Sequence, residues 1–192
     1  QRTVKEEMLD RLVNIAAKVT VGDPLDPRTR IGSMIHRQHM EKVEHFVGEG
    51  IRDGAGLVVG GRRLGNSGNY FAPTIFANAE PDMSVTRDEI FGPVLSVQTF
   101  DTPEEAIRLA NDTNYGLSAN VWTNDLGKAV QTIRAVRAGR TWINGAGTGG
   151  PEMGISGFRQ SGLGRELGRH GFDEYSTLKN VYIGLEDGGS VV

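Results

Sequence analysis

Residues 94–123 read VLSVQTFDTPEEAIRLANDTNYGLSANVWT, and this stretch decides the fold class because it joins two extended segments through one helix. The segment Val94–Phe100 predicts a strand. Thr102 then supplies an N-cap, with Pro103 and two acidic residues in the first turn, so a helix is predicted to run to about Ala110. Residues 117–123 are extended again. This succession favours an α/β sheet with helices packed on its faces.

The same alternation continues in both directions along the chain. Upstream, the patterns predict a helix over residues 4–18 behind a capping box at Thr3 and Glu6, a helix around residues 40–51, a strand at 57–59 and an extended run at 70–76. Pro73 confines that run to a sheet edge or a bulge. Downstream, they predict a helix over 126–136 and a strand over 141–143. The expected fold is therefore α/β, with a mostly parallel sheet flanked by helices.

The alternation stops at Gly145. A glycine-rich loop, a turn rich in Arg and Glu, and a strand-like segment at Thr177–Ile183 follow. An apolar β-like segment near a terminus suits pairing with something outside the domain. We therefore expect three parts: a domain over residues 1–144, a loop and turn over 145–171, and a β tail over 172–192.

Composition limits the function classes. The chain has 192 residues, a formal net charge of −3 and no cysteine, which excludes disulfides, thiolate metal sites and cysteine nucleophiles. The weak negative charge gives no field that would concentrate nucleic acid or an anionic membrane surface. No apolar run approaches the roughly 20 residues that cross a bilayer, and the polar segment opened by Gln1 has no signal-peptide pattern. We expect a cytosolic protein without nucleic-acid or membrane partners.

A glycine motif at residues 145–150, GAGTGG, matches the dinucleotide-binding fingerprint, and Glu166 lies at about the distance of the ribose-binding acid. That fingerprint needs a helix to open at its third glycine, so that the N-terminus faces the pyrophosphate. The segment from Pro151 to Gly157 cannot continue as a helix. We interpret the motif as a loop that passes close to a ligand or another strand.

Three histidines, His36, His39 and His45, gather near one predicted helix. Their spacing is not that of a metalloprotease, and no cysteine supports them. We interpret them as solvated surface residues and predict no metal site.

A further segment, Asp88–Val94, joins an acid and an aromatic residue to a turn that starts a strand. The carboxylate of Glu89 can accept hydrogen bonds from both hydroxyls of a ribose, and the ring of Phe91 can shield a flat heterocycle. From chemistry alone the simpler interpretation is favoured, namely an exposed Glu before a turn and a core Phe.

Residues 89–94, EIFGPV, resemble a motif of the aldehyde dehydrogenase superfamily, and this resemblance favours a ligand-binding role for Glu89 and Phe91. Further segments resemble the family in the right order: VGDPLDP at 21–27, YFAPTI at 70–75, ANDTNYGL at 110–117, WIN at 142–144 and SGLGRELG at 161–168. Several motifs at consistent spacing over about 180 residues are more specific than any single match. The chain is therefore identified as a member of this family, matching the second half of the catalytic domain and the oligomerisation tail.

The resemblance implies roles for particular residues. Glu89 would hold the nicotinamide ribose and Phe91 would pack against the nicotinamide of NAD or NADP. The tunnel for the aldehyde would be lined from Asn144, Gly149 and Ile155. Behind it, Ser161 and Gly162 would hold a turn, and Arg165 and Glu166 would brace it as a charge pair.

One departure concerns the substrate. Many family members carry an aromatic residue where this chain has Ile155, and residues 145–150 contain no aromatic residue either. The loss of both rings predicts a wider or more polar tunnel, which suits a bulky or aminated aldehyde.

The larger departure is catalytic. In this family the cysteine nucleophile, the general-base glutamate and the dinucleotide-binding fold precede the region that matches Gln1–Thr3. We therefore expect the chain to be part of a longer homodimeric or homotetrameric enzyme, inactive without its N-terminal half because no thiolate can attack the aldehyde. The alternative is a non-catalytic assembly or binding module, against which the retention of Glu89 and Phe91 argues.

Overall fold

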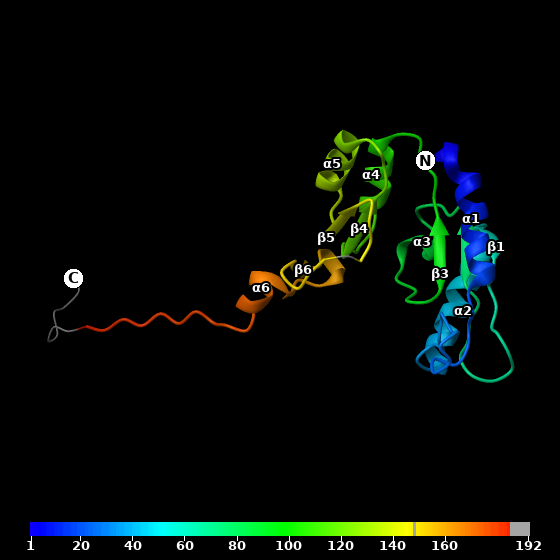
Figure 1. Cartoon of the computed structure of the whole chain (residues 1–192), viewed down its shortest axis with the longest axis horizontal. Helices are drawn as coiled ribbons and strands as arrows, with labels where there is room; N and C mark the ends of the chain where they lie inside the picture. Colours follow the sequence, from blue (N-terminus) through cyan, green and yellow to red (C-terminus); the bar gives the residue numbers. More distant parts are fainter. Residues whose placement is uncertain (148, 185–192) are drawn as a thin grey trace. The chain divides into compact units, whose positions relative to one another are not determined.

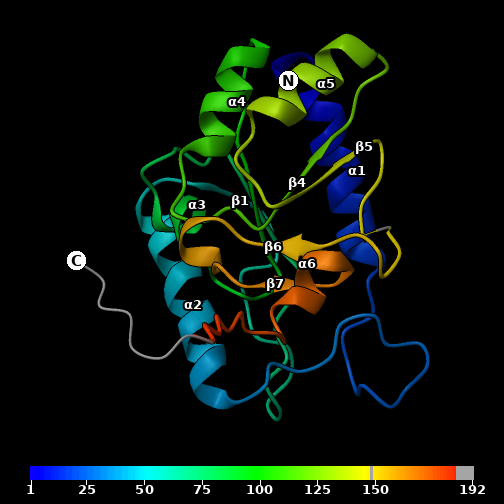
Figure 2. The ribbon, with the colours of Figure 1, turned by 90° about the vertical axis from the view of Figure 1, so that its left-hand side faces the viewer.

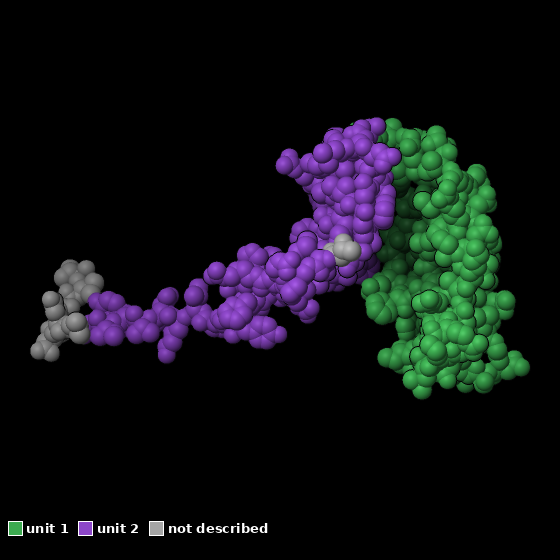
Figure 3. Space-filling view, in the orientation of Figure 1, with its two compact units in different colours: residues 1–113 green, residues 114–192 purple. Residues whose placement is uncertain are grey.

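The computed structural model describes residues 1–147 and 149–184, which fall into two compact units (Figures 1 and 3). Unit 1 contains residues 1–113, and unit 2 begins at residue 114. The fold is mixed α/β with parallel strand pairs, as predicted. The expected division at residues 144 and 171 falls inside unit 2 and stays a prediction. Of the expected tail, residues 185–192 lie outside the described part of the chain.

Unit 1 is built on a three-stranded sheet. Its elements are η1 (Arg2–Val4), α1 (Lys5–Lys18), α2 (Arg37–Arg52), β1 (Gly56–Val59), β2 (Thr74–Ala77), α3 (Ser84–Arg87), β3 (Val94–Val97) and α4 (Pro103–Asn111). The strand order is β1-β2-β3, with β2 antiparallel to β1 and parallel to β3. The helices over 4–18 and 102–110 are confirmed within one or two residues. The capping box is wrong, because Val4 precedes α1 and no side chain caps it.

The hydrophobic core of unit 1 lies on both faces of β2. Phe76 packs with Met40 and Val43 of α2, whereas Ile75, its neighbour along the strand, packs with Leu9 of α1. Successive side chains of a strand point to opposite faces, so α1 and α2 cover the two sides of the sheet (Figure 2). All four residues of β2 are buried.

The position of β2 corrects one half of the prediction from Pro73, which was a sheet edge or a bulge. The strand β2 is central, and its pairing with β1 has a register shift between Leu57 and Val59. Pro73 lies one residue before the strand, where its missing N–H removes no bond of the ladder, and the N–H of Thr74 donates to the Pro93 carbonyl at 2.8 Å. On the other side, Gly60 has φ +85°, and a Cβ there would lie 2.1 Å from the Pro73 carbonyl oxygen. Only glycine lets the chain pass so closely.

Unit 2 repeats the strand–helix–strand pattern on a smaller scale. Its elements are β4 (Ser118–Val121), α5 (Leu126–Ala135), β5 (Arg140–Ile143), β6 (Ile155–Ser156), η2 (Arg159–Ser161), β7 (Arg165–Glu166) and α6 (Gly168–Asp173). The parallel strands β4 and β5 are joined through α5, while β6 and β7 form an antiparallel pair beside α6 (Figure 2). The antiparallel pairs make the sheets less uniformly parallel than expected. Ala129 is the one buried hydrophobic side chain among the described residues of this unit.

The strand-like segment Thr177–Ile183 pairs with no other part of the chain that the structure describes. Residues 176–184 form no helix or strand, and Leu178, Tyr182 and Ile183 are exposed. A strand needs a partner for its backbone hydrogen bonds, and none lies beside this segment among the described residues. Pairing with a neighbouring subunit stays a prediction. No helix in the described part of the chain has the length and apolar character to cross a membrane.

Candidate functional site

The first candidate site is the motif loop, residues 88–93, which connects α3 to β3 in unit 1. Its backbone is anchored on both sides. The side chain of Ile90 is buried in the core with Val43, and Gly92 lies so close to the same valine that a Cβ would be 2.8 Å from its Cγ2. The Pro93 carbonyl accepts the hydrogen bond from Thr74. The loop is therefore part of the rigid sheet assembly.

Three side chains of the motif loop face solvent, those of Asp88, Glu89 and Phe91. Glu89 is exposed, and Phe91 is 77% exposed with φ +56°. The interpretation of Phe91 as a core residue is wrong, because the neighbouring Ile90 occupies the core. A left-handed backbone is rare for an aromatic residue and costs of order 1–2 kcal/mol. An exposed ring held in such a conformation fits a surface that receives a flat ligand.

The first two turns of α2 support this loop from the side. Lys42 Nζ donates a hydrogen bond to the Glu89 carbonyl oxygen at 3.0 Å. The imidazole of His39 lies beside the Phe91 ring, with 6.4 Å between centroids and a 36° angle between planes. Sequence reasoning missed both contacts. The only signal in the sequence for these contacts is the spacing of the histidines, which by itself suggests a metal site and not support of Phe91.

The other two histidines, His36 and His45, make their contacts with α2 itself. The Nδ1 of His36 accepts from the backbone N–H of His39 at 3.0 Å, so His36 is the N-cap of α2. His45 lies 3.2 Å from Glu49 one turn further along the helix. No group of three or more His, Asp or Glu side chains in the described part of the chain is arranged to hold a metal ion.

The remaining predicted site residues lie in unit 2, and Asn144 is the best fixed of them. It ends β5 with φ +52°. Its Nδ2 donates to the Thr123 carbonyl at 2.8 Å, and its Oδ1 accepts from the Thr123 N–H at 2.9 Å. Asparagine tolerates this backbone region better than most residues. Asn144 therefore ties the end of β5 to the segment after β4. The glycine loop of residues 145–150 begins directly after this tie.

Gly149 lies in that loop, on the far side of residue 148, which is outside the described part. Its φ is +150°, and a Cβ would lie 2.6 Å from a terminal nitrogen of Arg140. The guanidinium of Arg140 in turn lies over the Trp142 ring at 4.9 Å. Glycine at this position lets the loop pass directly over a stacked Arg–Trp pair.

Ile155 is half-buried in β6 and lines an open hollow of about 480 Å³. The hollow is also lined by Leu117 and Tyr175 and by three charged residues, Arg165, Glu166 and Glu174. A hydrogen bond from the Gly116 N–H to Ser161 Oγ at 3.0 Å holds the turn behind it.

The predicted charge pair behind this hollow takes another form. Arg165 and Glu166 pair through their backbones with Ser156 and Ile155, and no ion pair joins them among the described residues. They are neighbours in a strand, so their side chains point to opposite faces. The turn is therefore braced by β-pairing.

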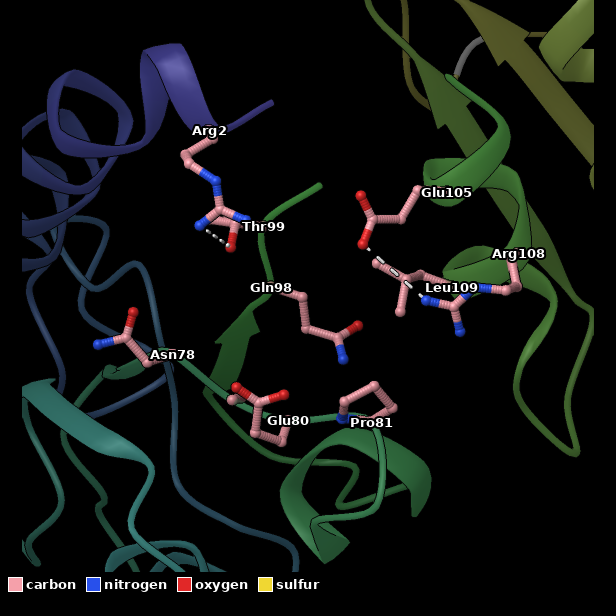
Figure 4. A pocket seen from close by; sticks show the side chains of 10 residues that line it. Arg2, Asn78, Glu80, Pro81, Gln98, Thr99, Glu105, Arg108 and Leu109 are labelled. Atoms are coloured by element: carbon pink, nitrogen blue, oxygen red, sulfur yellow. Dashed lines mark hydrogen bonds and ion pairs between the residues drawn. The ribbon is translucent and has the colours of Figure 1, made fainter. Parts of the chain in front are cut away.

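A second hollow, of about 330 Å³, opens in unit 1 beside the end of β3 and α4 (Figure 4). Its charged lining is balanced, with Arg2 and Arg108 against Glu80 and Glu105. Arg2 is also bound to Asp101 at 2.8 Å, and this guanidinium holds the pKa of the Asp101 carboxyl below its usual value. Balanced and already paired charges favour no particular class of charged ligand here.

The chain is similar to one protein family and to several solved structures. The aldehyde dehydrogenase family model matches residues 1–181. A NAD-dependent aldehyde dehydrogenase from Sinorhizobium meliloti is 53% identical, with a TM-score of 0.92. The match covers 99% of this chain and 38% of the other protein's chain. An indole-3-acetaldehyde dehydrogenase of P. syringae, solved with NAD+ and IAA, is 44% identical with a TM-score of 0.91, covering 96% and 38%.

A betaine aldehyde dehydrogenase from Staphylococcus aureus, solved with NAD+, is 35% identical with a TM-score of 0.87, covering 91% of this chain and 36% of its own. This chain thus spans less than two-fifths of the length of the solved structures it matches. The match covers both the motif loop of unit 1 and the β6–β7 turn of unit 2. This chain belongs to the aldehyde dehydrogenase family.

Proposed function

We propose that this chain supplies the nicotinamide-side cofactor contacts and part of the substrate tunnel of an NAD(P)-dependent aldehyde dehydrogenase, which oxidises an aldehyde to a carboxylic acid. The observation that carries the proposal is the motif loop. Its backbone is anchored in the core, whereas Glu89 and Phe91 are held toward solvent, Phe91 in an unfavourable backbone conformation. Such an arrangement serves a ligand rather than the fold.

The side chains of Glu89 and Phe91 fit the two parts of a nicotinamide nucleoside. The Glu89 carboxylate can accept hydrogen bonds from both ribose hydroxyls, and the Phe91 ring can cover one face of the nicotinamide. When bound, the nicotinamide accepts a hydride from the substrate. The part of these residues is to orient the ring and to exclude water from its covered face. The nucleophilic thiol must come from outside these 192 residues, which contain no cysteine.

The choice between NAD and NADP depends on the adenosine ribose, which Glu89 and Phe91 do not reach in this proposal. The solved relatives favour NAD, since one is described as NAD-dependent and two contain NAD+. The cytosolic location expected from the sequence stays a prediction.

Steady-state kinetics of the natural polypeptide that contains these residues tests this role. Glu89→Gln keeps the shape but removes the charge, and we expect its KM for NAD+ to rise about tenfold, as for a lost charge-assisted hydrogen bond. Phe91→Ala should raise the same KM by roughly 2- to 10-fold, the range for an aromatic pair. Matched controls are Glu104→Gln and Leu25→Ala, which change exposed residues away from the loop.

If neither loop variant changes the KM for NAD+ beyond the controls, the motif loop does not hold the nicotinamide. If the natural polypeptide oxidises no aldehyde, the enzymatic proposal is wrong and the assembly-module alternative replaces it.

For the substrate, we propose a bulky or aminated aldehyde. Ile155 stands where many family members carry a ring, and the loop of residues 145–150 contains no aromatic residue, so the channel that Ile155 and Gly149 would line is wider. Glu174 and Glu166, the strand partner of Ile155, line the hollow, whereas the side chain of Arg165 points to the other face of β7. This excess of acidic side chains favours a cationic substrate group. Two relatives support this class, one described as acting on indole-3-acetaldehyde and one on betaine aldehyde.

A comparison of kcat/KM for acetaldehyde, a neutral aromatic acetaldehyde and an aminoaldehyde tests the substrate class. We expect both larger aldehydes to exceed acetaldehyde. Glu174→Gln should lower kcat/KM for the aminoaldehyde and leave the neutral aromatic substrate unchanged, because only the first carries a charge. Acetaldehyde as the best substrate would refute the proposal.

We also propose that the segment Thr177–Ile183 pairs with a neighbouring subunit in a homodimer or homotetramer. Its side chains are exposed and its backbone has no strand partner within the described chain. Val181→Pro removes one backbone donor from such a strand and should shift the sedimentation coefficient toward the monomer. An unchanged coefficient would exclude this segment from the interface.

A further inference from the structure

We infer that His39 is a positioning residue for Phe91, holding the exposed ring where the nicotinamide is proposed to pack. The inference rests on the proposed function of the motif loop. The exposed ring of Phe91 needs a support. The backbone of Phe91 is fixed by its buried neighbour Ile90 and by Gly92, but its ring is 77% exposed and leaves the core entirely. An unsupported ring would change rotamer on a picosecond to nanosecond timescale.

The support comes from α2. The His39 ring lies 6.4 Å from the Phe91 ring between centroids, with the planes tilted by 36°. This separation is within the 4.5–7 Å range in which aromatic pairs attract each other. Because Phe91 remains mostly exposed, contact with His39 leaves most of its surface open to a ligand.

His39 is itself well placed to act as a support. It is the third residue of α2, and its backbone N–H is held by His36 Nδ1 at 3.0 Å. One residue later Met40 is fully buried in the core of unit 1. Three residues after His39, Lys42 ties the same helix to the Glu89 carbonyl. The imidazole therefore projects from a helix that is fixed both to the core and to the loop it supports.

This arrangement gives one helix two separate tasks at the loop. Lys42 fixes the backbone at Glu89 by a hydrogen bond, and His39 fixes the ring of Phe91 by packing. Loss of His39 should thus leave the ribose side of the ligand unaffected and loosen only the nicotinamide side. A purely structural residue would affect both sides or neither.

Binding measurements with two nucleotides separate these cases. NADH carries a fluorescent reduced nicotinamide, whereas ADP-ribose has the same adenosine diphosphate ribose without the nicotinamide. In the natural polypeptide that contains these residues, His39→Ala should weaken NADH binding by roughly 2- to 10-fold, the range for a lost aromatic pair, and reduce the enhancement of nicotinamide fluorescence on binding. ADP-ribose binding should not change. His39→Phe keeps a ring and should stay within about twofold of the wild type for NADH.

The control is His45→Ala, which removes an exposed histidine from the same helix away from the loop. If Phe91→Ala weakens NADH binding but His39→Ala does not, the positioning role is wrong and the proposed function stands. Equal losses for NADH and ADP-ribose in His39→Ala also overturn it, since they indicate a general structural defect. If the wild type binds no NADH, the proposed function fails and the inference fails with it.

Discussion

A pair of glycines in α2 tests how closely this helix packs against α3 and β2 in the core of unit 1. Gly50 is buried, and a Cβ there would lie 2.6 Å from Val85 Cγ1 and 3.3 Å from Phe76 Cζ. Gly48, two residues earlier, is half-buried, and its Cβ would meet only the flexible end of Arg52 at 3.3 Å. We compare Gly50→Ala with Gly48→Ala.

Both variants gain the same helix propensity, about 1 kcal/mol for alanine over glycine. Only Gly50→Ala must also fit a methyl group into a filled space, because Val85 and Phe76 are themselves buried with no room to retreat. Overpacking of this kind costs about 1–3 kcal/mol. We expect Gly48→Ala to stabilise the chain by up to about 1 kcal/mol, and Gly50→Ala to lie about 1–3 kcal/mol below it.

Urea unfolding followed by circular dichroism measures both free energies, with an unchanged slope m as the check on two-state behaviour. The comparison cancels the propensity term, so the difference reports the packing alone. Equal free energies of unfolding for the two variants would refute the close approach of α2 to α3.

Three further predictions concern single side chains. The Arg63 guanidinium hydrogen-bonds Glu44 and holds the pKa of that carboxyl below its ordinary value of 4.5. The stabilisation from this pair should be complete above pH 4.5, and it should be lost as the pH falls through the lowered pKa of the folded state. The difference in the free energy of unfolding between wild type and Arg63→Gln should therefore shrink at acid pH. Acid titrations monitored by fluorescence measure this difference. Asn144→Ala loses both bonds to Thr123 and should cost about 2 kcal/mol in urea unfolding, whereas Asn144→Gly should cost about 1 kcal/mol less because glycine adopts φ +52° freely. Thr102→Ala removes the side chain that caps α4 and should cost about 1 kcal/mol by thermal unfolding, while Thr102→Ser should stay close to the wild type.

Local signals predicted the fold where they agreed with each other. The helix α4 was found because its cap, proline and acids occur together at its start. The apolar spacing of α2 begins only at Met40, whereas the helix begins at Arg37, because His36 caps it and histidine is not among the usual capping residues. The helix α3, only four residues long, left no periodicity to detect.

Tertiary context decided the rest. Pro73 indicated a sheet edge or a bulge, but a proline just before a strand interrupts no hydrogen bond of the ladder, so β2 can be central. For the site, the family motif brought Glu89 and Phe91 to one loop in advance. It did not reveal that Phe91 adopts a left-handed backbone or that α2 lies beside it, since these follow from contacts across about 50 residues of sequence.

The covering of β2 by α1 on one face and α2 on the other also orders events during synthesis. The strands β1, β2 and β3 and the helix α2 are contiguous in the chain, so they can assemble as soon as they have been made. Leu9 of α1 packs on Ile75, which a ribosome adds roughly 3–13 s later at 5–20 residues per second. For that interval the face of α1 that packs on β2 lacks this strand. Within unit 1, the apolar face of α1 is thus a surface that a chaperone could cover until Ile75 has been added.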